Sequence, residues 1–493
     1  MHLTLAESFP VWLRATHWIN VFFIGFLIRA GIQILGSFPR LYWNDHCKPG
    51  TEWLRFTRKQ QPMDRMWTTL EEEEEVSPLI GQPGGSNLGL GRHWHFFAAI
   101  FWMLNGLVYL VLLFASGEWS RLVPTTWRIF PNAWQTMVAY LTFHAPPHSL
   151  YIGVYDPLQQ LAYFAVVFLL APFLILTAAA QSPAVEGRFP WYPKLFGGRQ
   201  GARSLHFLGL VGFLGFILIH TAMVFLTGPL HNFGDIIMGQ HTSHQGAALA
   251  IGLGIIILTF AIYGVTSWMS VRRPRAMTRA LSAVIRPPMA FLSRHSESRQ
   301  RQPLKQVSEF FIVNGQPPSS PEFLRLLWSD FADYRLEIGG LAGRPLSLSL
   351  ADLQALPKQT QITRHNCIQG WTSIGEWGGV PLREIVKLAQ PAENARYIVF
   401  HSFSLDTSGR EFYESVRLDL AQHPQALLAY EMNGHALPLA HGAPLRLRLE
   451  NQLGFKMVKW IRAIDFVEDF RTVREGLGGS REENKHYEQS VPI

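Results

Sequence analysis

The chain has 493 residues, of which 48% are hydrophobic and 16% are charged, and its formal net charge is +7. Soluble proteins contain about 25% charged residues, so this composition excludes a disordered chain and a chain that is a soluble enzyme throughout. With only two cysteines, Cys47 and Cys367, it also excludes a disulfide framework, a cysteine-ligated iron–sulfur cluster and a CxxCH haem attachment. No nucleic-acid-binding motif accompanies the basic excess, so we expect no nucleic-acid partner.

Long apolar segments occur only before about residue 270, and five of them are long enough to cross a membrane. A membrane-spanning helix needs about 20 mostly apolar residues. The hydropathy predicts five such helices, over residues 11–35, 93–115, 158–180, 204–227 and 247–270. We interpret the first as a retained span and not as a signal peptide, because it contains Trp12, Arg14 and His17 and no basic segment precedes it.

A long polar loop joins the first two predicted spans, and a basic segment follows the fifth. The loop contains a run of five glutamates, residues 71–75, which we interpret as a solvated face. Residues 271–305 are basic and interrupted by prolines, so they are predicted to form a linker. From residue 306 the pattern changes to short strand-like runs broken by Gly and Pro, which predicts a mixed α and β soluble domain with its own core.

The distribution of Lys and Arg predicts how the spans are oriented. With five spans, the loops after spans one and three and the C-terminal domain share one side of the membrane, named side B here. Side B carries 20 Lys and Arg residues, whereas the opposite side, side A, carries three. Because basic loops stay in the cytoplasm, we expect a multi-pass protein of the inner (cytoplasmic) membrane whose C-terminal domain is cytoplasmic.

Four histidines lie in or at the ends of the predicted spans: His17, His95, His206 and His220. Ionisable side chains are costly in a membrane, so histidines there suggest a function. His206 and His220 are 14 residues apart on the fourth span, within about 40° of one face and about 21 Å apart along the axis. In depth, His206 matches His95 at side B, and His220 matches His17 at side A. Such pairs suit two stacked haems, and hydrogen-bonded interface histidines are the alternative for each residue alone.

The segments PVWLRATHWIN, LGRHWHFFAAIFW, DPLQQLAYFAVVFLLAP and the H-x13-H fourth span resemble the di-haem cytochrome b subunits of nickel-iron hydrogenases and formate dehydrogenases. The resemblance covers roughly residues 8–270 and implies a four-helix di-haem core. The ligands that it implies for the two haem b irons are His17, His220, His95 and His206. His93 is a rival to His95, but the family's ligand stands three residues after an arginine, here Arg92, which favours His95.

Cys367 lies in the segment TRHNCIQGWTSIGEWGGVPLREIV, after a strand-like run. A buried structural cysteine is the plainer interpretation, because cysteine is among the most buried residue types. Arg364 and His365, however, are expected to raise the local positive potential, which favours a thiolate, and soft metals prefer thiolate ligands. Cys367 is therefore a candidate metal ligand.

Several segments around this cysteine, SEFFIVNGQPP, DYRLEIGGLAGRPLSLSLADLQALP, FYESVRLDLAQ, LLAYEMNGHALPLAHGAPLRLRLE and GFKMVKWIRAIDF, resemble the sulfite oxidase and methionine-sulfoxide reductase superfamily of molybdopterin enzymes. The resemblance implies that Cys367 binds molybdenum. The residues that it implies around the pterin and its phosphate are Asn314, Arg364, His365, Ser402, His441, Arg446, Met457, Val458 and Lys459. It also implies that Tyr413 hydrogen-bonds an oxyanion or sulfoxide, so that Cys367, Tyr413 and Arg364 form the catalytic set.

Alternatives stay open for several of these residues. Arg446 and Lys459 are cations suited to a phosphate, although charged side chains are more often exposed surface groups. A packed aromatic side chain is the alternative for Tyr413. Gly315 stands where the sulfite oxidases have a pterin-binding histidine, so this part of the motif departs from the superfamily.

The combination predicts the function. No GxGxxG motif follows a strand, and no CxxC or P-loop motif is present, so the haems are the only obvious electron partners. We expect a membrane-bound molybdopterin oxidoreductase that links the quinone pool, through two b haems, to oxygen-atom transfer on a small oxo-substrate. The reaction is the reduction of an S-oxide or N-oxide, or the oxidation of sulfite. The alternative is an electron-transfer or redox-sensing cytochrome b with a non-catalytic docking domain, and a transporter is disfavoured by the paired histidines.

The predicted organisation has three parts. Residues 1–270 form a transmembrane di-haem cytochrome b domain, residues 271–305 a basic linker and residues 306–493 a molybdopterin-binding oxidoreductase domain. The fold class is an α-helical transmembrane bundle of five spans, followed by a soluble α+β domain of the sulfite oxidase type. The substrate, the direction of the reaction, the quinone type and the oligomeric state do not follow from the sequence.

Overall fold

A computed structural model describes the chain except for residues 1–8, 63, 152–153, 240–242, 294–303 and 490–493. Residues 294–303 of the predicted linker therefore lie outside the described residues. The chain divides into two compact units. The first unit comprises residues 1–31, 94–179 and 205–272, and the second comprises residues 32–93, 180–204 and 273–493. The second unit thus contains the first loop and the segment between spans three and four, in addition to the C-terminal domain.

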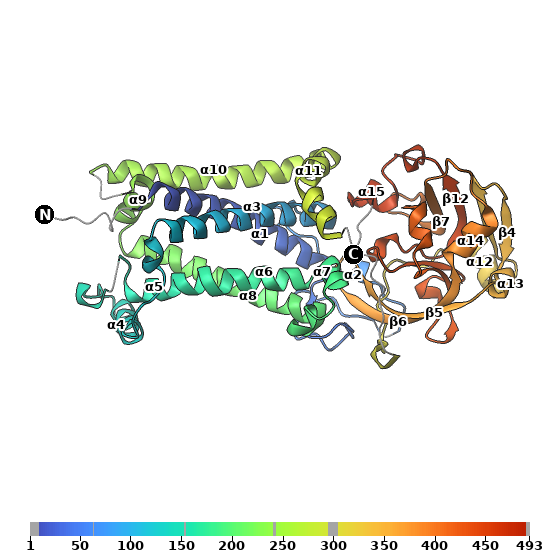
Figure 1. Ribbon diagram of the computed structural model, residues 1–493, viewed down its shortest axis with the longest axis horizontal. Coiled ribbons are helices and arrows are strands. Elements are labelled where there is room, and N and C mark those ends of the chain that lie inside the picture. The colour runs from blue at the N-terminus through green and yellow to red at the C-terminus, as the bar shows by residue number, and fades with distance from the viewer. Residues whose placement is uncertain (1–8, 63, 152–153, 240–242, 294–303, 490–493) are drawn as a thin grey trace. The chain divides into compact units, whose positions relative to one another are not determined.

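Five helices among the described residues are long and apolar enough to cross a membrane, as the sequence predicted. In the first unit the long helices run side by side (Figure 1). The five spans are Val11–Ser37 (α1), Leu88–Ala115 (α3), Pro157–Ala180 (α5 to α6), Gly198–Leu226 (α8) and Gln245–Arg272 (α10).

The third span changes its helical geometry in the middle. It consists of α5 (Pro157–Phe164), a π-helical segment η4 (Ala165–Leu170) and α6 (Ala171–Ala180). Pro172 has no backbone N–H to donate to the preceding turn, which accounts for the wider π-helical turns before it. Asp156 caps the helix by accepting a hydrogen bond from the Gln159 N–H at 2.9 Å.

Shorter helices complete the α-structure. In the first unit they are α4 (Ile129–Leu141) and α9 (Pro229–Met238). In the second unit they are α2 (Thr69–Glu72), α7 (Pro183–Arg188), α11 (Pro274–Ser293), α12 (Pro321–Trp328), α13 (Leu350–Ala355), α14 (Leu382–Ala389) and α15 (Ser480–Lys485). The predicted linker thus begins with the 20-residue helix α11, whose first residue, Pro274, suits a helix start.

Two five-stranded sheets form the described C-terminal domain. The first has the strand order β10-β9-β6-β5, with β11 paired to β9, and the second has the order β4-β3-β12-β7-β8. Every strand pair in them is antiparallel except β3 with β12. The strands are β3 (Arg335–Gly340), β4 (Leu346–Ser349), β5 (Gln359–Asn366), β6 (Thr372–Pro381), β7 (Tyr397–Leu405), β8 (Glu411–Arg417), β9 (Ala426–Met432), β10 (His435–Ala436), β11 (Arg446–Leu449) and β12 (Ile461–Val467). A short ladder of β1 (Arg40–Leu41) and β2 (Leu54–Arg55) lies in the first loop.

Two apolar clusters stabilise the second unit. The larger one lies within the C-terminal domain and contains Leu336, Ile385 and Ile464, from β3, α14 and β12. The smaller one joins Phe38, Trp67 and Leu88 of the first-loop region to residues around Cys367. Burial of apolar surface contributes about 25 cal/mol per Å². The first loop therefore packs as part of the folded domain that contains Cys367.

The glutamate run of the first loop is not the solvated face that the sequence predicted. Glu72 is fully buried and pairs with Arg40, which is also buried. Glu74 accepts a hydrogen bond from the Thr57 hydroxyl at 2.6 Å. The physical reason is that the buried Arg40 guanidinium needs a carboxylate partner, because an unpaired buried charge is costly.

A buried ion cluster attaches the C-terminal segment to β8. Lys456 Nζ lies 2.8 Å from Glu414 Oε2 of β8 and also contacts Glu482 of α15. These three side chains are at most 2% exposed. Burial and the neighbouring Glu414 raise the pKa of Glu482 well above its ordinary range, which favours a neutral Glu482 beside the Lys456–Glu414 ion pair.

Replacing Lys456 tests this cluster. We expect Lys456→Ala to destabilise the protein by about 3–5 kcal/mol, because it leaves buried carboxylates without their cation. For a domain of this size, that corresponds to a fall of roughly 6–20 °C in melting temperature, measurable by thermal unfolding. Lys387→Ala is the control, since Lys387 is 77% exposed and its pair with Glu384 should contribute little. Equal melting temperatures for the two variants would contradict the assignment.

His401 gives a pH-dependent contribution to stability. Burial alone would lower the pKa of His401, but hydrogen bonds with Asp465 and Glu411 raise it to about 9 from the ordinary 6.5. A raised pKa stabilises the fold fully below about pH 6.5, and this stabilisation is lost as the pH rises through about 9. Between about pH 7 and pH 10, the melting temperature should therefore fall more for the wild type than for His401→Gln. Parallel curves would show that His401 is not the group responsible.

Candidate active site

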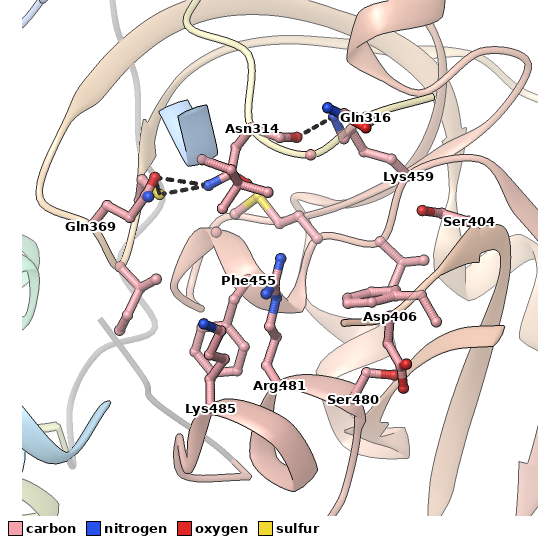
Figure 2. Close-up of a pocket in the computed structure, with 18 of the residues that line it drawn as sticks. Asn314, Gln316, Gln369, Ser404, Asp406, Phe455, Lys459, Ser480, Arg481 and Lys485 are labelled. Atoms are coloured by element: carbon pink, nitrogen blue, oxygen red, sulfur yellow. Dashed lines mark hydrogen bonds between the residues drawn. The ribbon is translucent and has the colours of Figure 1, made fainter. Parts of the chain in front are cut away.

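A cavity of about 280 Å³ in the second unit contains most of the predicted molybdopterin residues. Figure 2 shows part of its wall. The first loop, the strands of the C-terminal domain and the segment after residue 478 all contribute to this wall. The predicted residues that line it are Asn314, His365, Cys367, Ser402, His441, Arg446, Met457, Val458 and Lys459.

Cys367 directly follows strand β5 and is 3% exposed. Its Sγ lies 3.7 Å from Asn314 Nδ2 and 3.8 Å from Gln369 Oε1. Burial raises the pKa of the Cys367 thiol to about 11, so this thiol is protonated at neutral pH unless a bound cation replaces the proton. The side chain is thus positioned as a metal ligand whose ionisation depends on the metal.

The prediction that Arg364 and His365 favour a Cys367 thiolate is wrong. Successive side chains of a strand point to opposite faces, so Arg364 of β5 points away from the face of His365. Arg364 forms ion pairs with Asp45, at 2.7 Å, and with Glu186, and it does not line the cavity. Burial and the nearby Arg448 lower the pKa of His365, which keeps its ring neutral.

Tyr413 also lies outside the cavity wall. It is fully buried on β8, and its hydroxyl donates a hydrogen bond to Glu483 of α15. Its ring stacks on His401 of the neighbouring strand, with ring centroids 6.4 Å apart. The structure therefore brings neither Tyr413 nor Arg364 to the cavity that contains Cys367.

Two cations of the wall, the buried Arg446 and the partly buried Lys459, form no ion pair with a carboxylate among the described residues. Arg446 Nη1 donates to the His441 carbonyl at 2.8 Å, whereas Arg446 Nε is buried and unpaired in the part of the chain that the structure describes. Lys459 Nζ donates to the carbonyls of Asn314 and Ala440. Burial and Arg446 lower the pKa of Lys459, and burial with these two cations lowers that of His441 to about 3. A phosphate would relieve this repulsion, so these residues fit the phosphate of a pterin cofactor.

Two positions of the cavity wall require glycine, Gly454 because of close packing and Gly315 because of its backbone conformation. A Cβ at Gly454 would overlap the His365 ring, so only glycine leaves room there. Gly315 has a φ of +78°, in the left-handed region, where a histidine would be strained. The left-handed backbone conformation at residue 315 therefore explains why this chain has a glycine where the sulfite oxidases have a histidine.

Sequence reasoning missed several wall residues, among them Gln369. Its Oε1 accepts hydrogen bonds from Asn314 at 2.9 Å, Trp371 at 3.1 Å and Thr69 at 2.8 Å. The position of Gln369, two residues after Cys367, was a signal that could have identified it, but its partner Thr69 is 300 residues away. The other missed residues include Asp406, Ser480, Arg481, Asn484, Lys485 and Tyr487.

The first unit brings together the two predicted histidine pairs. The ring centroids are 6.4 Å apart both for His17 with His220 and for His95 with His206. A metal with bonds of about 2 Å to a nitrogen of each ring fits between rings at this separation. His206 Nδ1 lies 3.1 Å from Thr177 Oγ1, which leaves Nε2 as the nitrogen for a metal.

His93, the rival ligand, is engaged elsewhere in the second unit. Its Nδ1 lies 2.7 Å from the Gly89 carbonyl, and its Nε2 lies 3.4 Å from Glu488 Oε1. These contacts use both ring nitrogens. The geometry therefore favours His95 over His93 as the partner of His206.

Comparisons with known families agree with this two-part architecture. Residues 8–237 match the model of the prokaryotic cytochrome b561 family, and residues 325–473 match that of the oxidoreductase molybdopterin binding domain. The chain thus combines a cytochrome b561-type membrane region with a molybdopterin-binding oxidoreductase domain, and it is an integral membrane protein.

Two of its relatives are named for methionine-sulfoxide reduction. A proposed protein-methionine-sulfoxide reductase subunit, YedZ1 of Azospira oryzae, is 36% identical over 135 residues, which are 27% of this chain and 49% of that protein. The catalytic subunit MsrP of a protein-methionine-sulfoxide reductase from Xanthomonas axonopodis pv. citri is 33% identical over 170 residues, 32% of this chain and 51% of MsrP. The chain therefore spans about half the length of the curated relatives that it matches.

One solved structure is also similar in sequence. The sulfane dehydrogenase SoxCD of Paracoccus pantotrophus is 26% identical and is matched over 31% of this chain and 40% of that chain. Its TM-score is 0.26, which is too low for a comparison of the two folds.

Proposed function

We propose that the protein is a membrane-bound molybdenum oxidoreductase that reduces a small sulfoxide with electrons from the quinone pool, transferred through two b haems. The observation that carries this proposal is the cavity whose wall contains Cys367 together with the buried Arg446 and the partly buried Lys459. The relatives named for methionine-sulfoxide reduction support the sulfoxide as the substrate class. The excess of Lys and Arg on side B supports a cytoplasmic C-terminal domain.

The residues of the cavity have separate roles in this proposal. Cys367 would hold the molybdenum after its thiol loses the proton, and Asn314 and Gln369 orient its sulfur through their contacts with it. Arg446 and Lys459 would neutralise the pterin phosphate. A bound molybdenum–pterin group supplies oxygen-atom transfer coupled to two electrons. Overall, a sulfoxide, two electrons and two protons give a sulfide and water.

The histidine pairs provide the electron route of the proposal. His17 with His220 and His95 with His206 would each hold one b haem, a group that supplies one-electron transfer. The hydroxyls near the rings, Tyr163 Oη for His220 and Thr177 Oγ1 for His206, orient the imidazoles. The spacing of His206 and His220 along α8 supports two haems at different depths, one of them near a quinone.

The metal content of purified protein tests the role of Cys367. For wild-type protein from a host that makes the cofactor, we expect about one molybdenum and two haems per chain, by elemental analysis and pyridine haemochrome. Cys367→Ser should lose sulfoxide reduction and most of the molybdenum and keep its haems, because a serine hydroxyl is a poor ligand for a soft metal. Cys47→Ser is the matched control, since Cys47 is also buried and free but lies outside the cavity wall.

Two outcomes would contradict this assignment. Two haems without molybdenum in the wild type would leave an electron-transfer or sensing protein. Equal loss of molybdenum in both cysteine variants would show a general effect on folding instead of a ligand at position 367.

The haem ligands are tested separately. His206→Ala should reduce the haem content from about two to about one per chain, because one of the two imidazoles of a pair is lost. His93→Gln should keep both haems, as an amide can replace the hydrogen bonds of His93. Haem loss in His93→Gln but not in His206→Ala would overturn the pairing.

A further inference from the structure

A C-terminal strap, residues 478–489, forms one side of the cavity. It lies beyond residue 473, where the match to the molybdopterin-binding family ends. Its first part contains helix α15, which follows Gly479. The strap residues that line the cavity are Ser480, Arg481, Asn484, Lys485 and Tyr487. This chain therefore completes its site with a segment that the family match does not include.

Hydrogen bonds fix the beginning of the strap along β8. The Tyr413 N–H donates to Ser480 Oγ at 3.0 Å, and the Arg481 N–H donates to Glu414 Oε1 at 3.1 Å. The Ser415 N–H donates to the Gly478 carbonyl at 2.8 Å. Together with the buried contact of Lys456 and Glu482, these bonds hold α15 in one position on the sheet.

The end of the strap is held by Glu488. Its carboxylate accepts hydrogen bonds from the Ser282 hydroxyl, at 2.5 Å, and from Arg286 Nε, at 3.3 Å, and it lies 3.4 Å from His93 Nε2. A Cβ at Gly89 would overlap the Lys485 carbonyl, so the strap also packs directly against the first turn of α3. The strap is therefore attached at both ends, and its side chains are held in place between them.

Arg481 is one of two cations, with Lys485, that the strap places on the cavity wall. Its backbone is anchored to Glu414, and Figure 2 shows its side chain extending from α15 into the cavity. Within the described residues, no carboxylate lies at ion-pair distance from its guanidinium, whose nearest ring is Phe412, 5.6 Å away. Other arginines of this region are paired, such as Arg410 with Glu475 and Glu483.

Among the described residues, the cavity wall contains two carboxylates, Asp406 and Glu73. Asp406 already accepts hydrogen bonds from Ser408, from the Arg410 N–H and from Asn484. Burial raises the pKa of Glu73, whereas the nearby cations Lys485 and Arg481 act in the opposite direction. Because the proposed function assigns the pterin phosphate to Arg446 and Lys459, the guanidinium of Arg481 is left for a second anion.

We propose that the strap forms the substrate side of the cavity and that Arg481 binds a carboxylate of the substrate. This assignment rests on the proposed sulfoxide reduction and makes its substrate class more specific. The substrate is then a small sulfoxide that carries an anionic carboxylate, and not a neutral sulfoxide. The planar guanidinium fork matches the two oxygens of a carboxylate, which orients the sulfoxide group relative to Cys367.

The test compares two probes that differ in charge and by one methyl group, N-acetylmethionine sulfoxide and its neutral methyl ester. With a reduced dye as donor, Arg481→Gln should raise the KM for the acid about 10- to 100-fold, because it removes a charge-assisted hydrogen-bond pair. The KM for the ester and the kcat for both probes should change little. Arg481→Lys should give a smaller increase for the acid, because it keeps the charge and loses the fork.

A second readout does not depend on turnover. Calorimetric titration with the product, N-acetylmethionine, should show a similar 10- to 100-fold weakening in Arg481→Gln. Arg471→Gln is the control, since Arg471 is 72% exposed and paired with Asp469 outside the cavity wall. Haem and molybdenum contents are measured for each variant.

The possible outcomes separate this assignment from the proposed function. Unchanged binding of the acid in Arg481→Gln, equal losses for acid and ester, or loss of molybdenum would each overturn the role of Arg481, the last because it would make Arg481 a cofactor residue. A wild type that reduces neither probe but binds N-acetylmethionine through Arg481 would refute sulfoxide reduction and support the anion site.

Discussion

The cost of burying charge is the constraint on which the second unit depends. Arg446 is buried and Lys459 is partly buried, and both have carbonyls and ring faces as partners, an arrangement that is unfavourable unless an anion is bound near them. The same strands place the Cys367 thiol on the wall of that cavity. The two cations leave positive charge on the cavity wall, which the phosphate of the proposed pterin cofactor would neutralise.

Paired buried charges have a different role in the same unit, because they attach distant segments to the domain. Arg364 pairs with Asp45 of the first loop and with Glu186 of α7. Lys456 contacts Glu482 of the C-terminal strap. Removing one partner of such a pair costs far more than an exposed ion pair contributes, so each pair specifies one position for its segment. The loops after the first and third spans consequently belong to the unit that holds the oxidoreductase site.

In the membrane region, histidines occupy partly buried polar positions, whereas charged side chains occupy buried ones in the second unit. Neutral imidazoles are less costly in an apolar bundle than carboxylates or ammonium groups, and they are also haem ligands. Each proposed pair takes one ring from α8, at its opposite ends, and the other from α1 or α3. A single helix thereby determines the spacing of both proposed metal positions.

The sequence by itself determined the five spans, the mixed C-terminal domain and nine of the residues that line the cavity, because hydropathy and short ordered motifs are local properties. It also paired His17 with His220 and His95 with His206, since helical periodicity converts spacing into depth. Only the tertiary structure decided the places of Arg364, Tyr413, Glu72 and the strap. Their partners are Asp45, Glu483, Arg40 and Glu414, which lie far away in the sequence or are not part of a recognisable motif. The ion pairs and hydrogen bonds that position these residues therefore cannot be predicted from a local sequence pattern.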